Sequence, residues 1–299
     1  MIKNLVIFFD KKNEQCIRAK YSTKLQDLRE IMESHGVEFF WKFVEGNCGD
    51  AKAAGAVADG LSFANWKDSI YLVDDSANLD VLKLYGYYAV ALIHEFNRDI
   101  EFKNARYIIE GLDGIDYCYL EKVYQRLAGL PWEILETKRL KVRESTVEDV
   151  EDFYRIYKEP SITYYMENLH ADVDEERAYV KDYIRHVYGL YGYGMWTVIL
   201  KETGEVIGRA GISVRDGYET PELGFMIESV HQGKGYASEV CGDILKYAFE
   251  ELEMDRIQAL VCELNEGSKR VLKRVGFDYY EDVTEEGKKY QLWVKSLSE

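Results

Sequence analysis

The segment Gln232-Gly233-Lys234-Gly235-Tyr236-Ala237 decides the fold of the second half of the chain. The sequence predicts a strand from Glu222 to Ile227 before it, and an amphipathic helix from Ala237 to Glu250 after it. A glycine-rich turn that opens a helix presents unpaired backbone N–H groups at the positive end of the helix dipole. The arrangement therefore predicts a binding site for a pyrophosphate.

The residue types within this turn agree with that prediction. Gly233 and Gly235 allow the backbone to approach a ligand closely, and Lys234 adds a positive charge. The turn is not a P-loop, because it lacks Gly-Lys-Ser/Thr, and it is not a dinucleotide fingerprint. Taken alone, the two glycines are also compatible with a simple tight turn.

The order of motifs resembles the GNAT family of N-acetyltransferases. The turn is similar to that family's Gln/Arg-x-x-Gly-x-Gly/Ala loop, and Asn265-Glu266-Gly267-Ser268 followed by Gly276-Phe277 is similar to its second motif. Residues 137–143 and 159–166 resemble the branch that acetylates ribosomal-protein N-termini. The resemblance covers about residues 137–294 and implies a GNAT-fold domain with a mixed, mostly antiparallel sheet.

The resemblance implies acetyl-CoA as a co-substrate, a primary amine as the acceptor and no metal. The acetyl group passes directly to the amine of a protein N-terminus or a small molecule in a ternary complex. The implied acetyl-CoA ligands are the main chain of Met226 and Ile227, the segment from Gln232 through Tyr236 to Ala237, and Asn265. Asn265 is alternatively a plain helix cap. The alternative function is a non-catalytic acyl-CoA-binding sensor or regulatory protein.

Glu222 is the predicted general base, because it begins the strand expected beside the cofactor. An exposed carboxylate at a strand end is the other interpretation of Glu222. His170 and His231 are alternative bases, although His231 directly precedes the glycine-rich turn and is expected mainly to shape it.

The sequence departs from many relatives at the general acid. They carry a tyrosine four residues after the position of Ser268, where this chain has Leu272. Ser268 either replaces that acid or only caps its helix. An aromatic set is expected either to line an acceptor groove or to belong to the core: Trp196, Tyr188, Tyr191 and Tyr193.

The first half alternates short apolar runs with helix-length segments, which predicts a Rossmann-like parallel sheet. Strands are expected at residues 5–9, 37–44, 69–73, 88–93 and 105–109, and helices after a Ser22 cap, at residues 50–60, after Ser76 and at residues 116–127. The segment from Gly129 to Trp132 interrupts the pattern, which places the predicted domains at residues 1–130 and 131–299.

Two acidic positions give the first domain a weak resemblance to haloacid-dehalogenase-like phosphatases. Asp74-Asp75 ends a predicted strand, as in that family's last motif, and Asp10 ends the first strand. Lys12 stands where the family needs a second aspartate for Mg²⁺. We therefore expect a degenerate, non-catalytic domain; a response-receiver-like domain is a further option.

Composition excludes several classes of protein. The net charge of −16 makes nucleic acid a poor partner, and it either attracts a cationic acceptor or serves solubility alone. No apolar run is long enough to span a membrane, and no signal-peptide cleavage site follows the first strand. The scattered cysteines (Cys16, Cys48, Cys118, Cys241, Cys262) predict free thiols in the cytoplasm. A homodimer stays open.

Overall fold

The computed structural model describes residues 1–45, 66–166, 168–285 and 287–297. Contacts between Cα atoms divide the chain into two compact units, Met1–Leu130 and Pro131–Glu299. The helix expected at residues 50–60 and Cys48 lie outside the described residues. None of the described helices is long and apolar enough to cross a membrane.

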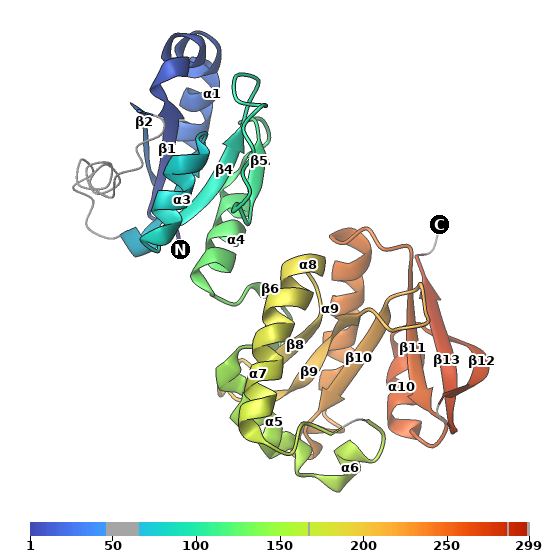
Figure 1. The fold of residues 1–299 in the computed structure, drawn as a ribbon. Helices are drawn as coiled ribbons and strands as arrows, with labels where there is room; N and C mark the ends of the chain where they lie inside the picture. Colours follow the sequence, from blue (N-terminus) through green and yellow to red (C-terminus); the bar gives the residue numbers. More distant parts are fainter. Residues whose placement is uncertain (46–65, 167, 286, 298–299) are drawn as a thin grey trace. The chain divides into compact units, whose positions relative to one another are not determined.

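The first unit contains a parallel sheet of five strands in the order β2-β1-β3-β4-β5 (Figure 1). All residues of β1 are buried, as expected for a central strand that helices cover on both faces. The strands are β1 (Asn4–Asp10), β2 (Glu38–Val44), β3 (Ser69–Val73), β4 (Tyr88–Ile93) and β5 (Ile108–Glu110). The long helices are α1 (Glu14–Ser34), α3 (Ser76–Leu84) and α4 (Tyr117–Ala128).

Alternation along β1 produces two separate cores. Leu5, Ile7 and Phe9 pack with residues of α1 and α4, whereas Val6 and Phe8 pack with residues of α3. The prediction that Ser22 caps the first helix is wrong. Ser22 lies inside α1, and its hydroxyl donates a hydrogen bond to the Arg18 carbonyl within the helix.

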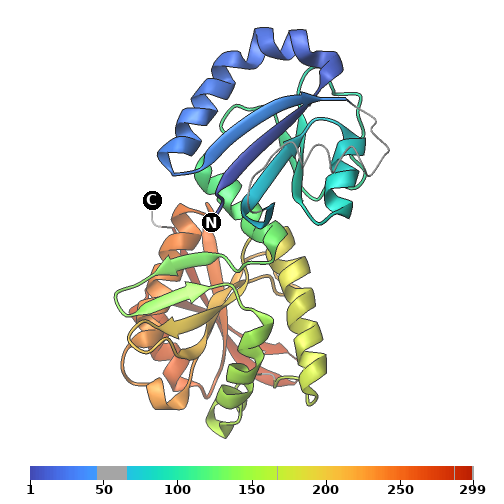
Figure 2. The same cartoon turned by 90° about the vertical axis from the view of Figure 1, so that its left-hand side faces the viewer.

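The second unit contains an eight-stranded mixed sheet in the order β12-β13-β11-β10-β9-β8-β7-β6, with the β6–β7 hairpin at one edge (Figure 2). The strands are β6 (Glu133–Glu136), β7 (Leu140–Arg143), β8 (Met195–Leu200), β9 (Val206–Ser213), β10 (Glu222–Ile227), β11 (Arg256–Cys262), β12 (Asp278–Glu285) and β13 (Lys288–Ser296). The helices that matter here are α5 (Val150–Tyr157), α6 (Pro160–Thr163), α7 (Val173–Tyr183), α9 (Tyr236–Glu250) and α10 (Glu266–Arg274).

The parallel strands β10 and β11 separate along their length, and this separation positions the site. Among the described residues, Glu222 and Gln258 are the only Cα partners between the two strands, whereas β10 pairs with β9 from Glu222 to Ile227. Most of the β10 edge that faces β11 is therefore unpaired by protein. β11 is held instead by β13, which pairs with it from Arg256 to Cys262.

Some elements of this unit end or begin at identifiable residues. α5 ends at Tyr157, and Pro160 occupies the first turn of α6, where its missing N–H costs nothing. α7 ends at Tyr183 and continues as a π-helical turn over Ile184–Tyr188. β6 and β12 were not expected; almost every residue of β12 is exposed, so its sequence lacks the alternation that identifies a strand.

Candidate functional site

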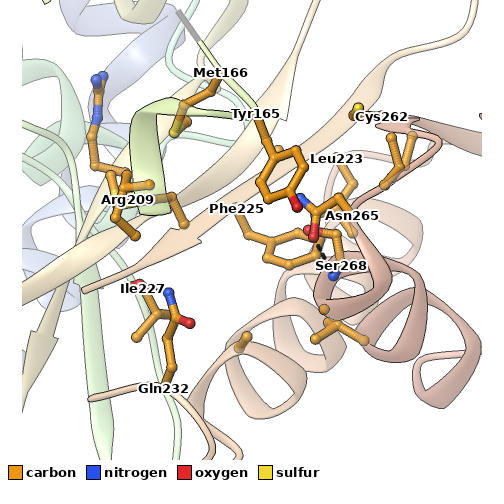
Figure 3. Close-up of a pocket in the computed structure, with 18 of the residues that line it drawn as sticks. Tyr165, Met166, Arg209, Leu223, Phe225, Ile227, Gln232, Cys262, Asn265 and Ser268 are labelled. Carbon is orange, nitrogen blue, oxygen red and sulfur yellow. Dashed lines mark hydrogen bonds between the residues drawn. The ribbon is translucent and has the colours of Figure 1, made fainter. Parts of the chain in front are cut away.

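A pocket of about 1390 Å³ opens where β10 and β11 separate (Figure 3). One wall is formed by the two strands, the glycine-rich loop and the start of α10. The other wall is formed by residues of α5, α6, α7 and the segments that join them. The predicted residues that line it are Glu222, Met226, Ile227, Gln232, Gly233, Gly235, Tyr236, Ala237, Asn265 and Ser268. Lys234 is exposed and does not line it.

The glycine-rich loop leaves the first turn of α9 without a side-chain cap. Gly235 is the N-cap residue with φ of 83°, a left-handed conformation that glycine adopts without strain. The first loop-to-helix hydrogen bond runs from the Glu239 N–H to the Gly235 carbonyl, so the N–H groups of Tyr236, Ala237 and Ser238 have no partner within the helix. These donors and the helix dipole suit a pyrophosphate.

Arg139, at the start of the unit, holds this loop from the outside. Its guanidinium Nε donates to the Glu239 carboxylate over 2.7 Å, and Nη1 donates to the Lys234 carbonyl over 3.0 Å. The guanidinium also lies 4.3 Å from the ring centroid of Tyr236. The loop conformation is therefore fixed by a residue about 100 positions away in the sequence. No local motif in the sequence indicates this contact.

Gln232 ties the loop to the end of β10. Its Nε2 donates a hydrogen bond of 2.8 Å to the Ile227 carbonyl, and Figure 3 shows the two residues together. A Cβ atom on Gly208 of β9 would collide with the Met226 carbonyl oxygen, which shows that this oxygen points toward β9. Because direction alternates along a strand, the main-chain groups of Phe225 and Ile227 face the cleft and those of Met226 do not.

Glu222 lies at the narrow end of the cleft. Its Oε2 is 3.3 Å from Nη1 of Arg215, and its carboxylate also receives a hydrogen bond from the Leu260 backbone N–H of β11. Burial raises the pKa of Glu222 above its ordinary value, although Arg215 and the Leu260 N–H oppose the shift. Met195 fills the space beside Gly224, because a Cβ on Gly224 would meet the Met195 Sδ at 2.9 Å.

Asn265 and Ser268 lie at the start of α10, and Figure 3 shows both beside Tyr165. The Asn265 Oδ1 accepts a hydrogen bond of 3.0 Å from the Ser268 N–H, so Asn265 caps the helix. The Asn265 side chain also lines the pocket, where its Nδ2 is a possible donor to a ligand. The Tyr165 hydroxyl donates to the Leu264 carbonyl over 3.3 Å, which joins the segment that follows α6 to the segment that precedes α10.

The two histidines considered as bases have different surroundings. Glu176 is buried and accepts hydrogen bonds from both the backbone N–H and Nδ1 of His170, at 3.0 and 2.7 Å. This leaves the Nε2 of His170, a residue of the pocket wall, as the proton acceptor. His231 instead contacts Glu205 and Glu228.

Glu205, Glu228 and His231 form the one group of possible metal ligands found among the described residues. Their ligand atoms lie within 4.8 Å of one another. However, Arg155 already forms ion pairs with Glu205 and Glu228, so a cation is in place there. The group joins α5, the β8–β9 hairpin and the residue that precedes the loop, and it supports the loop rather than the reacting groups.

Comparisons with known proteins agree with this geometry. Residues 139–278 match the family model described as an acetyltransferase (GNAT) domain. The uncharacterized N-acetyltransferase p20 of Bacillus licheniformis is 33% identical over 149 residues, covering 48% of this chain and 82% of p20. The chain belongs to the GNAT acetyltransferase family. It is therefore an acyltransferase, and enzymes of this family use acetyl-CoA.

One further relative and one solved structure are also similar to this GNAT chain. The putative ribosomal N-acetyltransferase YdaF of Bacillus subtilis is 39% identical over 56 residues, 19% of this chain and 31% of YdaF. A solved acetyltransferase from Agrobacterium tumefaciens aligns at 23% identity with a TM-score of 0.48, over 55% of this chain and 94% of that one.

Other aromatic and apolar residues of the GNAT domain have structural positions. Leu272 is fully buried in the main core, as are Trp196 and Tyr188, so the core interpretation holds for the latter two. Burial raises the pKa of the Tyr188 hydroxyl well above its ordinary range, and that hydroxyl accepts from the Ser145 N–H over 3.1 Å. Tyr191 and Tyr193 are not in the pocket wall, so no aromatic groove forms from this set.

In the first unit, the carboxylates at the ends of β1 and β3 have Lys12 beside them. The Lys12 ammonium lies 2.8 Å from the Asp10 carboxylate. The Asp74 Oδ1 accepts from the Asp10 N–H, and its Oδ2 accepts from His94 Nε2, at 2.7 and 2.9 Å. Burial raises the pKa of Asp74, while these hydrogen bonds act against the shift. Asp75 caps α3 by accepting a hydrogen bond of 3.0 Å from the Asn78 N–H.

Proposed function

We propose that this chain transfers an acetyl group from acetyl-CoA to a primary amine by direct attack in a ternary complex. One observation carries the proposal. A single pocket joins the uncapped N-terminus of α9, the unpaired edge of β10, and the carboxylates of Glu222 and Glu176. The first feature suits the pyrophosphate, the second suits the pantetheine amides, and the carboxylates suit a cationic amine.

Acetyl-CoA is proposed to lie along the cleft between β10 and β11. The N–H groups of Tyr236, Ala237 and Ser238 bind the pyrophosphate. The main chain of Phe225 and Ile227 pairs with pantetheine as a neighbouring strand would, in place of the expected contact from Met226. The Asn265 Nδ2 donates to a pantetheine carbonyl while its Oδ1 keeps the helix cap.

Glu222 is proposed to accept the proton of the attacking amine, directly or through water. Its raised pKa moves it toward the value of an ammonium group, which makes the proton transfer less unfavourable. The His170–Glu176 pair is the second candidate, because a buried carboxylate orients the ring and leaves Nε2 available. Ser268 is proposed as the donor to the departing thiolate, since Leu272 is buried in the core.

The proposed acceptor is a protein N-terminus or a small-molecule amine. The name of YdaF, a putative ribosomal N-acetyltransferase, favours the first. Residues 131–299 are proposed to be the cytoplasmic catalytic domain, and residues 1–130 a Rossmann-like domain without catalysis.

An acceptor screen tests the function. Purified protein is mixed with acetyl-CoA and a set of amines, including peptides, polyamines and amino acids, and free CoA thiol is measured. We expect acceptor-dependent thiol release that falls in Glu222→Gln. Binding of acetyl-CoA without thiol release from any acceptor would support the alternative of an acyl-CoA sensor.

A further inference from the structure

One cation of the pocket, Arg209, has no carboxylate partner among the residues that the structure describes. Arg209 lies on β9, where its Cα partner is Met226 of β10; its side chain faces α5, and it lines the pocket. Figure 3 shows its side chain running toward the side of Met166 and away from Gln232. Its contacts with Phe153 and Tyr157 place the guanidinium on the α5 side of the pocket, which we expect the acceptor, and not the CoA moiety, to occupy.

The contacts of Arg209 are aromatic and neutral. Its guanidinium lies 4.6 Å from the ring centroid of Phe153 and donates a hydrogen bond to the Tyr157 hydroxyl. Its Nε is buried and has no hydrogen-bond partner among the described residues. No ion pair joins it to any carboxylate in the part of the chain that the structure describes, whereas Arg215 in the same pocket pairs with both Glu222 and Glu285.

A mostly buried guanidinium without an anion is costly, because its charge has lost water and gained no counter-charge. A planar guanidinium with free N–H groups matches a carboxylate, which it binds through two parallel hydrogen bonds. Two carboxylates line the same pocket, Glu222 beside Arg215 and Glu176 beside His170. The pocket thus offers carboxylates for an ammonium group and a guanidinium for an anion.

We propose that Arg209 binds a carboxylate of the acceptor, so that the preferred substrate carries both an amine and a carboxylate. This inference rests on the proposed acetyl transfer and narrows its acceptor class. The carboxylate is either the α-carboxylate of an amino acid or the acidic side chain of a peptide near its N-terminus. Arg209 is then an acceptor-binding residue and takes no part in proton transfer.

Matched acceptors test the inference by kcat/KM from thiol release. Amino acids are paired with their carboxamides, and peptides that carry Asp or Glu near the N-terminus are paired with Asn or Gln peptides. We expect the carboxylate member of at least one series to be preferred about 10- to 150-fold, the range for one hydrogen bond to a charged group. The series that shows the preference identifies the source of the carboxylate.

Variants assign the preference to the residue. Arg209→Gln should reduce the ratio of kcat/KM between the carboxylate acceptor and its neutral partner to nearly one, by slowing only the carboxylate acceptor. Arg209→Lys should keep part of this preference. Arg185→Gln, which removes an exposed arginine of the same unit outside the pocket wall, should leave it unchanged. A purely structural role predicts equal loss with both members of a pair.

Calorimetry with the N-acetylated products of the same pairs gives a second answer that needs no turnover. We expect tighter binding of the carboxylate product by the wild type and no such selectivity in Arg209→Gln. Equal affinity for both products, no measurable selective binding, or selectivity that survives in Arg209→Gln would overturn the inference. Equal turnover of both members of every pair would also overturn the inference about Arg209, while leaving the proposed acetyl transfer intact. If no acceptor reacts but the selective binding of the carboxylate product is retained, the result would instead contradict the proposed function.

Discussion

Replacing Gly235 with valine should separate cofactor binding from folding. Gly235 has φ of 83°, and a Cβ there would meet nothing closer than Arg139 Nη2 at 3.6 Å. The cost of the change is therefore conformational and not a clash with protein atoms. A left-handed non-glycine residue costs about 1–2 kcal/mol, and a β-branched one lies at the upper end.

The effect of Gly235→Val on the affinity for acetyl-CoA follows from the three N–H groups at the start of α9 that have no partner within the helix. A backbone that escapes the left-handed region turns these donors away from the pyrophosphate. Each lost hydrogen bond to a charged group is worth about 1.5–3 kcal/mol, so loss of one raises Kd by roughly 10- to 150-fold. Calorimetric titration with acetyl-CoA measures this directly.

Gly217 provides the matched control. It lies in the turn between β9 and β10 with φ of 84°, a Cβ added to it would meet no described atom within 4 Å, and it does not line the pocket. Gly217→Val should lose a similar free energy of unfolding and keep the wild-type affinity. A folded Gly235→Val protein with unchanged affinity for acetyl-CoA would refute the assignment of the loop.

Three further predictions concern other groups. Glu222→Gln should lower kcat about 10²–10⁴-fold at neutral pH with unchanged acetyl-CoA affinity. Because burial raises the pKa of Glu222 and the base must be ionised, the wild-type rate should fall on acidification at a higher pH than an ordinary glutamate would give. Wild-type turnover in this variant would redirect the test to His170. Asn265→Ala should cost about 1 kcal/mol of unfolding free energy and weaken acetyl-CoA binding, whereas Asn265→Asp should keep the cap and lose only affinity; equal affinities in calorimetry would argue against the pantetheine contact. The full chain should show no Mg²⁺-dependent hydrolysis of an aryl phosphate, because Lys12 neutralises Asp10; hydrolysis that disappears in Asp10→Asn would overturn this.

The sequence was sufficient where an element is defined by adjacent residues. The glycine-rich loop, its flanking strand and helix, and the Asn265 motif are local, and they were predicted with nearly correct boundaries. The Arg139–Glu239 contact was not predictable, because no periodic signal connects residues that lie about 100 positions apart.

Errors in the predicted elements have similar physical causes. Ser22 resembles a cap in sequence, but a helix that begins at Glu14 continues through it since α1 packs its apolar side on the sheet. The sequence also gives no sign of Arg209, because only the folded structure shows that its guanidinium has no carboxylate partner among the described residues.

The position of β13 affects how the protein matures. β13 lies between β11 and β12 in the sheet, although its residues 288–296 follow both in the sequence. Among the described residues β11 has a single partner pair with β10, so until β13 is inserted one wall of the cleft lacks hydrogen-bonded support. During synthesis on the ribosome, the glycine-rich loop and α9 emerge well before that insertion. A nascent chain interrupted after β12 would therefore contain every recognisable motif of the enzyme and still lack a formed cleft.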